Sequence, residues 1–289
     1  MTTAANDDLR YGHDVGYLDA PSAASVPRAM RRRSPATFVV LVVALSVPFW
    51  VVGTFVPGIR LIGLPVSALQ FAAPLGAALI LVVRDEGGAA AIALVRRTLA
   101  FGSVRPRWLY LPLLTVLPAI YVGSWLVQRA AGRPVSAPDV ALGTLAVLVG
   151  LFLVTAVAEE AGWSGYATAP MLERHGILAT GVALGVVWAL IHVVPDIQNG
   201  HDLGWIVFHR LGSVGLRLLL VTAFAASGGS VAAAVLMHAT DNISWAVVTD
   251  EGAGYDPAIT GVLIAVTGLT AALMATRWLR APIGDDRGP

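Results

Sequence analysis

Residues 141–168 read ALGTLAVLVGLFLVTAVAEEAGWSGYAT. An apolar run of this length can cross a bilayer as a helix, since about 20 residues span the hydrocarbon core. The run leads into two adjacent carboxylates, Glu159 and Glu160. An ionisable side chain at membrane depth costs roughly 2.5–3.5 kcal/mol even on the lenient insertion scale, so such residues are usually paired, protonated or functional. The pattern therefore predicts a membrane helix that carries a polar site.

The composition of the whole chain agrees with a membrane protein. Of the 289 residues, 56% are hydrophobic and only 13% are charged, whereas soluble domains carry about 25% charged residues. The apolar composition predicts contact with the lipid bilayer, and the net charge of +1 gives no reason to expect nucleic acid or acidic partners. The absence of Cys excludes disulfides, thiolate metal sites and a cysteine nucleophile. All basic residues are Arg, which together with the abundance of Ala, Gly and Val indicates a bacterial genome of high GC content.

Eight apolar segments are each long enough to cross the bilayer. They predict an all-α fold, a polytopic membrane helical bundle of about eight transmembrane helices. Residues 1–36 are expected to form a disordered cytoplasmic tail, residues 37–280 the membrane domain, and residues 281–289 a short C-terminal tail. The segment 84–107 is expected to lie at the membrane surface. The predicted spans are 37–57, 62–83, 108–128, 141–168, 177–195, 204–226, 230–248 and 258–279.

Arginine residues gather on one side of the predicted bundle. Because positively charged loops stay inside the cell, this distribution places both termini in the cytoplasm, and an even number of spans agrees. We therefore expect a multi-pass protein of the cell membrane. The arginines on this side are Arg28, Arg31, Arg32, Arg33, Arg84, Arg96, Arg97, Arg105, Arg107, Arg174, Arg277, Arg280 and Arg287.

Polar residues also interrupt two later spans. His192 lies in VVWALIHVVP, and His238, Asp241 and Asn242 lie in MHATDN. A neutral imidazole can bind a metal, donate a hydrogen bond or carry a proton. His238 and Asn242 are four residues apart and share one helix face, where the carboxamide can fix the ring or donate to a developing oxyanion. Asp241 lies roughly on the same side and is a candidate supporting residue.

Glu159 and Glu160 cannot face one cavity in the same way, because neighbouring residues on a helix point about 100° apart. This separation indicates one chemical and one structural carboxylate. A carboxylate in an apolar cavity suits a general base that works near neutral pH.

Three short motifs follow one another along the chain: EEAGWSGY at 159–166, WALIH at 188–192 and HATDN at 238–242. Their order resembles the CAAX proteases and bacteriocin-processing enzymes (the CPBP family, formerly the abortive-infection family). That family has Glu-Glu-x-x-x-Arg, Phe-x-x-x-His and His-x-x-x-Asn on successive helices of an eight-helix fold. The similarity covers roughly residues 140–250. The resemblance implies an intramembrane metalloprotease of the CAAX prenyl protease 2-like type, with membrane-embedded or membrane-anchored peptides or proteins as substrates.

The resemblance also implies a role for each residue. Glu159 would activate the attacking water, and Glu160 would be a second, more structural acid. His192 and His238 would bind a metal or position the water and the oxyanion, with Asn242 as their polar partner. The classification implies a divalent metal, with zinc as the expected ion. The chain lacks an HExxH motif, and a purely glutamate-driven mechanism is the alternative.

The chain departs from the family pattern at two positions. Trp188 stands where the family has Phe, an aromatic exchange that we expect to matter little. Ser164 stands where the family has the Arg that would pair with Glu160 along the helix. Our hypothesis is that Arg210 or Arg217, both in the sixth span, supplies the missing cation; otherwise Glu160 is protonated.

Two positional expectations depend on the predicted boundaries. Glu159 falls in the cytoplasmic half of its span and His192 near the outer end of the next, so the two meet only if a span is shifted or tilted. Asp196 is a weaker candidate partner of His192, because Pro195 is expected to end the helix before it.

Two other classes of function stay open from the sequence. One is a catalytically degenerate membrane protein, an immunity or regulatory factor that binds a peptide or a partner, which Ser164 favours. The other is a proton-coupled transporter that uses Glu and His as a relay. The absence of an internal repeat argues against the transporter.

Overall fold

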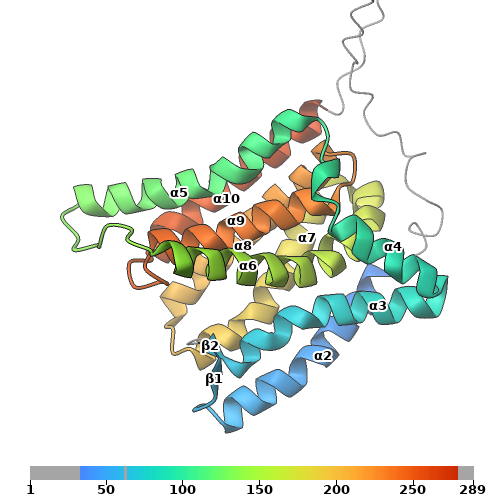
Figure 1. The fold of residues 1–289 in the computed structure, drawn as a ribbon, viewed down its shortest axis with the longest axis horizontal. Helices are drawn as coiled ribbons and strands as arrows, with labels where there is room; N and C mark the ends of the chain where they lie inside the picture. The colour runs from blue at the N-terminus through green and yellow to red at the C-terminus, as the bar shows by residue number, and fades with distance from the viewer. Residues whose placement is uncertain (1–32, 62–63, 279–289) are drawn as a thin grey trace, which may run out of the picture.

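The computed structural model describes residues 33–61 and 64–278. The predicted C-terminal tail and the predicted N-terminal tail up to residue 32 lie outside the described residues. Within the described ranges the chain forms eight long helices (Figure 1). The predicted all-α membrane bundle is therefore confirmed.

The first span is the helix α2 (Pro35–Phe55). It begins before the predicted residue 37, because the Ser34 side chain accepts a hydrogen bond from the Thr37 backbone N–H and caps the helix. Arg33, which was assigned to the disordered tail, is only 5% exposed. The ordered membrane domain therefore begins a few residues earlier than predicted.

The second predicted span, 62–83, is not one continuous helix. Two short antiparallel strands, β1 (Arg60–Leu61) and β2 (Leu64–Pro65), precede a 3₁₀-helix, η2 (Val66–Ala72), and then α3 (Ala73–Glu86). Pro65 caps η2 and Pro74 lies in the first turn of α3. Because proline lacks a backbone N–H, it is tolerated at the beginning of a helix but not in its interior. The two prolines therefore divide the segment into η2 and α3.

A short helix, α4 (Gly88–Thr98), occupies the predicted surface segment between the second and third spans. Its 11 residues extend only about 16 Å, too short to cross a bilayer. Two 3₁₀ turns, η3 (Phe101–Ser103) and η4 (Arg107–Leu109), then lead into α5 (Tyr110–Ala130).

The fourth and fifth spans form one continuous run of helix up to a glycine turn. Helix α6 (Leu142–Gly162) passes through a π-helical segment, η5 (Trp163–Thr168), into α7 (Ala169–Gln198). At Gly176 the backbone adopts φ 73° and ψ 179°, a conformation that glycine reaches without strain. The turn between these two spans therefore lies beyond the predicted end at residue 168.

The last three spans match their predicted limits closely. They are α8 (Leu203–Ala226), α9 (Val231–Val248) and α10 (Pro257–Trp278). Helices α8 and α10 pack backbone to backbone: a methyl group at Gly212 would lie 2.9 Å from the Cα of Gly261, and one at Gly215 would clash with Ala265. Small residues at a membrane-helix interface permit this close approach.

Seven segments within the described residues are long and apolar enough to cross a membrane, and one of them, 142–198, has 57 residues, enough for two crossings. Figure 1 shows the beginning of α2 and the end of α10 on the side of the bundle that carries α4, here called the α4 end. The connections α5–α6, α7–α8 and α9–α10 lie at the opposite end, here called the loop end.

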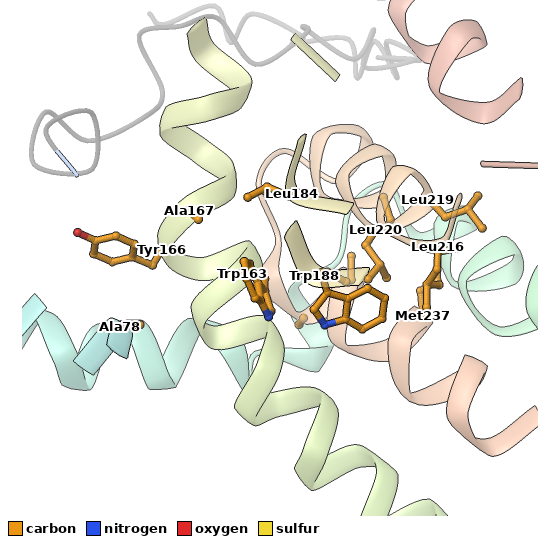
Figure 2. Close-up of a cluster of buried hydrophobic side chains, with 14 of the residues drawn as sticks. Ala78, Trp163, Tyr166, Ala167, Leu184, Trp188, Leu216, Leu219, Leu220 and Met237 are labelled. Carbon is orange, nitrogen blue, oxygen red and sulfur yellow. The ribbon is translucent and has the colours of Figure 1, made fainter. Parts of the chain in front are cut away.

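Large apolar side chains cover the outside of the bundle, including Val40 at 69% and Leu111 at 70% exposed. In a bilayer these side chains contact lipid. The interior holds a hydrophobic cluster built around Trp163 and Trp188, which Figure 2 draws together with Leu184, Leu216 and other members. The glutamates of the first motif lie beside this cluster.

Candidate active site

Glu160 of α6 lies at the centre of a buried network and is 0% exposed. Nη1 of Arg217, from α8, donates to both carboxylate oxygens at 3.0 and 2.8 Å. The Ser164 hydroxyl donates to Oε2 at 2.5 Å, and Nδ1 of His238, from α9, lies 2.9 Å from Oε1. A buried charge is tolerated when it is both paired and hydrogen-bonded. The predicted replacement cation is therefore found in Arg217, and Ser164 contributes a hydrogen bond in place of the family's Arg.

Glu159 has different partners from Glu160, as expected for neighbours on a helix. The indole Nε1 of Trp188, from α7, donates to its Oε2 at 2.7 Å. Oε1 accepts no hydrogen bond from the described part of the chain, and the residue is 6% exposed. Glu159 is thus held through one oxygen, and its other oxygen has no hydrogen-bond donor among the described residues.

Trp188 is the central contact of the site. Its ring lies 5.0 Å from the ring of His192 and 5.5 Å from that of His238, measured between centroids. The guanidinium carbon of Arg217 lies 4.7 Å from its centroid, a distance at which a cation is attracted to the face of an indole ring. The exchange of Phe for Trp adds an indole N–H that holds Glu159, a donor that a phenyl ring lacks.

The hydrogen bonds of the two histidines define which ring nitrogen faces the site. Nδ1 of His192 lies 2.8 Å from the carbonyl oxygen of Trp188, which can only accept, so Nδ1 carries the proton. Nδ1 of His238 likewise donates to the Glu160 carboxylate. In both rings Nε2 is left to act on a substrate or a water.

Asn242 lies one turn beyond His238 on α9, with a half-buried side chain. The partner of His238 Nδ1 is Glu160 and not Asn242. Asp241 is buried and lies near Tyr121 of α5. Its Oδ1 has no partner among the described residues.

Glu159 and His192 both lie against Trp188 because the helix is longer than predicted. Glu159 precedes Gly176 by 17 residues and His192 follows it by 16. Each residue therefore lies about 25 Å of helix away from the glycine turn. Both contact Trp188. The mismatch in depth expected from the predicted boundaries is therefore removed by the extension of the fourth span to the glycine turn.

Arg210 does not take part in the Glu160 network. Its guanidinium pairs with Asp196, at 2.8 Å from Nε to Oδ2 and 3.1 Å from Nη2 to Oδ1. Pro195 does not end the helix, which continues to Gln198, because a proline in the last turn displaces only one backbone hydrogen bond. Asp196 is therefore the partner of Arg210 rather than of His192.

The sequence resemblance implies a zinc ion at this site. Catalytic zinc is held by three protein ligands. Within the described ranges, no three His, Cys, Asp or Glu side chains are grouped so that they could hold a metal ion. His192 and His238 thus lack a third ligand, and the arrangement does not fit a three-ligand zinc site.

Three residues contribute to the site in ways that the motifs did not indicate. Trp163 lies under the Arg217 guanidinium, 5.7 Å from its ring centroid. Tyr121 comes from α5, outside the motif region, and approaches Asp241. Ser164 was interpreted only as a lost cation, although a hydroxyl four residues after Glu160 is correctly spaced to donate to it.

The fold and these contacts define a helical membrane protein with buried Glu and His side chains gathered between α6, α7 and α9, as in a hydrolytic site. The family model for type II CAAX prenyl endopeptidase Rce1-like proteins matches residues 141–244, less than half of the chain. This region is therefore similar to the Rce1-like proteins, and the resemblance seen in the sequence is confirmed. This similarity supports a membrane endopeptidase of the CAAX-protease kind. A comparison with curated proteins found no match.

Proposed function

We propose that the protein is an intramembrane endopeptidase that hydrolyses a peptide bond in a membrane-embedded or membrane-anchored substrate, using a water activated by Glu159. The observation that carries the proposal is the hydrogen bond from Trp188 to one Glu159 oxygen, with the other oxygen unbonded within the described chain. A general base needs one such oriented, accessible oxygen.

The reaction can be written with residues of this chain alone. Glu159 takes a proton from water while the water oxygen attacks the carbonyl carbon of the substrate. Nε2 of His238 stabilises the oxyanion, since Glu160 stabilises positive charge on that ring. The C–N bond then breaks, and the proton held by Glu159 passes to the leaving nitrogen.

Ser164 no longer favours a degenerate protease. The cation that the motif lacks is supplied by Arg217, so the Glu160 network is complete without an Arg at position 164. We further propose that the protein lies in a bacterial cell membrane with the α4 end in the cytoplasm. The exposed Arg84 and Arg96 at that end support this orientation.

The experiment that tests the proposed function combines cleavage with metal content. Wild-type protein in lipid nanodiscs and the His192→Ala/His238→Ala variant are incubated with membrane-anchored peptides, and bound metal is measured by mass spectrometry. We expect cleavage by the wild type that survives chelation, and none by the variant. Stoichiometric zinc that is lost in the variant, together with chelator-sensitive cleavage, would replace the glutamate-driven route by a metal-dependent one. A wild type that cleaves no peptide tested would count against the protease.

Replacing Trp188 with Phe removes the donor to Glu159 and keeps an aromatic ring. A hydrogen bond to a charged group is worth about 1.5–3 kcal/mol, so kcat/KM should fall about tenfold to a hundredfold. The control is Trp108→Phe, because Trp108 lies in η4 before α5 and is 63% exposed. Equal kinetics for the two variants would show that the indole N–H does not hold the base.

A further inference from the structure

Arg33 ties the beginning of α2 to the helix that carries the site. Its Nε and Nη2 donate to the two carboxylate oxygens of Glu86, at 2.7 and 3.1 Å. Its Nη1 donates to the carbonyl oxygen of Gly165 at 2.8 Å, and its guanidinium carbon lies 5.1 Å from the Tyr166 ring centroid. The Arg33 side chain is only 4% exposed. One buried arginine thus joins α2, the end of α3 and the segment η5.

The backbone that Arg33 contacts has an unusual conformation. Gly165 and Tyr166 belong to η5, which is π-helical. Such segments are rare, occur mostly as single turns within α-helices, and are frequent at functional sites. Arg33 supplies a hydrogen-bond donor to this turn from outside its own helix.

The same turn presents two side chains to the site. Ser164 donates to Glu160, and Trp163 lies beneath the guanidinium of Arg217. Figure 2 shows the Tyr166 ring projecting away from Trp163 and Trp188. Arg33 therefore contacts one side of the π-helical turn while the other side contacts the Glu160–Arg217 pair.

We propose that Arg33 is a positioning residue for the active site, which fixes the π-helical turn and thereby places Ser164 and Trp163 against the Glu160–Arg217 pair. Glu86 orients Arg33 by accepting both of its other donor groups. The part that concerns turnover rests on the proposed function, whereas the part that concerns geometry applies to the resting protein.

A purely structural role would have a different consequence. If Arg33 only anchored α2 to α3, its removal would lower the thermal stability and leave the environment of His238 unchanged. The test therefore needs a signal from the site itself. Nδ1 of His238 donates to Glu160, so its nitrogen resonance reports directly on the position of that carboxylate.

The experiment uses full-length protein labelled with ¹⁵N-histidine in nanodiscs, with the His238 signal assigned by its absence in His238→Gln. Arg33→Ala should shift this signal and lower kcat about tenfold with KM nearly unchanged, because a small misplacement of catalytic groups has large effects. Arg84→Ala is the matched control, since Arg84 is an exposed arginine of α3 that pairs with Asp85. It should change neither quantity.

Leu113→Ala controls for stability alone. Leu113 is buried in α5 at 2% exposure, and its truncation should lower Tm while leaving the His238 signal in place. An Arg33→Ala variant that loses stability like Leu113→Ala but keeps the wild-type His238 signal would overturn the proposal.

Milder variants cover the case in which Arg33→Ala does not fold. Arg33→Lys keeps the charge but cannot bond Glu86 and Gly165 with the same fork geometry, and Glu86→Gln removes the charge that orients Arg33. Both should shift the His238 signal in the same direction, and wild-type signals in both would contradict the proposal. If the wild type cleaves no peptide, the proposed function fails, but the His238 signal still decides the role of Arg33.

Discussion

Glu159→Gln should abolish peptide hydrolysis and leave the protein folded. Glutamine has the size of glutamate, and its amide oxygen can still accept the hydrogen bond from Trp188. It cannot take a proton from water, however, and loss of a general base costs about a hundredfold to ten-thousandfold in rate. The measurement is kcat on a membrane-anchored peptide, with Tm recorded on the same preparation.

Glu160→Gln is the informative comparison for this prediction. It removes a carboxylate that accepts from Arg217, Ser164 and His238, so it should lower Tm as well as activity. Glu159→Gln should lower activity alone. Measurable turnover by Glu159→Gln near the wild-type rate would assign the base to another residue.

Arg217→Leu should be the most destabilising single change in the site. It leaves the Glu160 carboxylate buried without its cation, and breaking a buried ion pair from one side costs about 3–5 kcal/mol. The effect should appear as a large fall in the midpoint of thermal unfolding in nanodiscs. Arg210→Leu should have a smaller effect, because the Arg210–Asp196 pair retains some exposure, 12% and 9% of the two side chains.

A second substitution should repair this defect. Ser164→Arg places a guanidinium four residues after Glu160, the spacing at which helical side chains meet. The double variant Ser164→Arg/Arg217→Leu should regain most of the lost stability, whereas Ser164→Arg alone should destabilise by burying a second cation. A double variant as unstable as Arg217→Leu would show that the two positions are not interchangeable sources of charge.

The sequence predicted the spans well because each depends on local composition. The last three helices begin and end within about one residue of their predicted limits. The predictions failed where backbone geometry is set by single residues. Pro65 and Pro74 divide the second span, and Gly176 delays the turn after the fourth. Hydropathy alone contains no information on these breaks.

The site was predictable as a set of residues but not as a set of contacts. The motif spacing pointed to Glu159, Glu160, His192 and His238, and the missing cation was sought in the sixth span, where Arg217 provides it. The contribution of Trp188 was missed because hydrophobicity treats Trp and Phe alike, although only Trp has a donor. Contacts from distant segments, such as Arg33 to Gly165, leave no pattern in a single sequence.

The glycine packing between α8 and α10 has a consequence for how a substrate enters. Two helices whose backbones touch at Gly212 and Gly215 cannot slide past each other by changing side-chain rotamers. They form a rigid wall, and this wall carries Arg217. By contrast, α2 and α5 bury the smallest share of their spanning residues. If the proposed function holds, we expect a peptide that reaches Glu159 from the bilayer to displace one of these two peripheral helices, while α8 and α10 stay fixed.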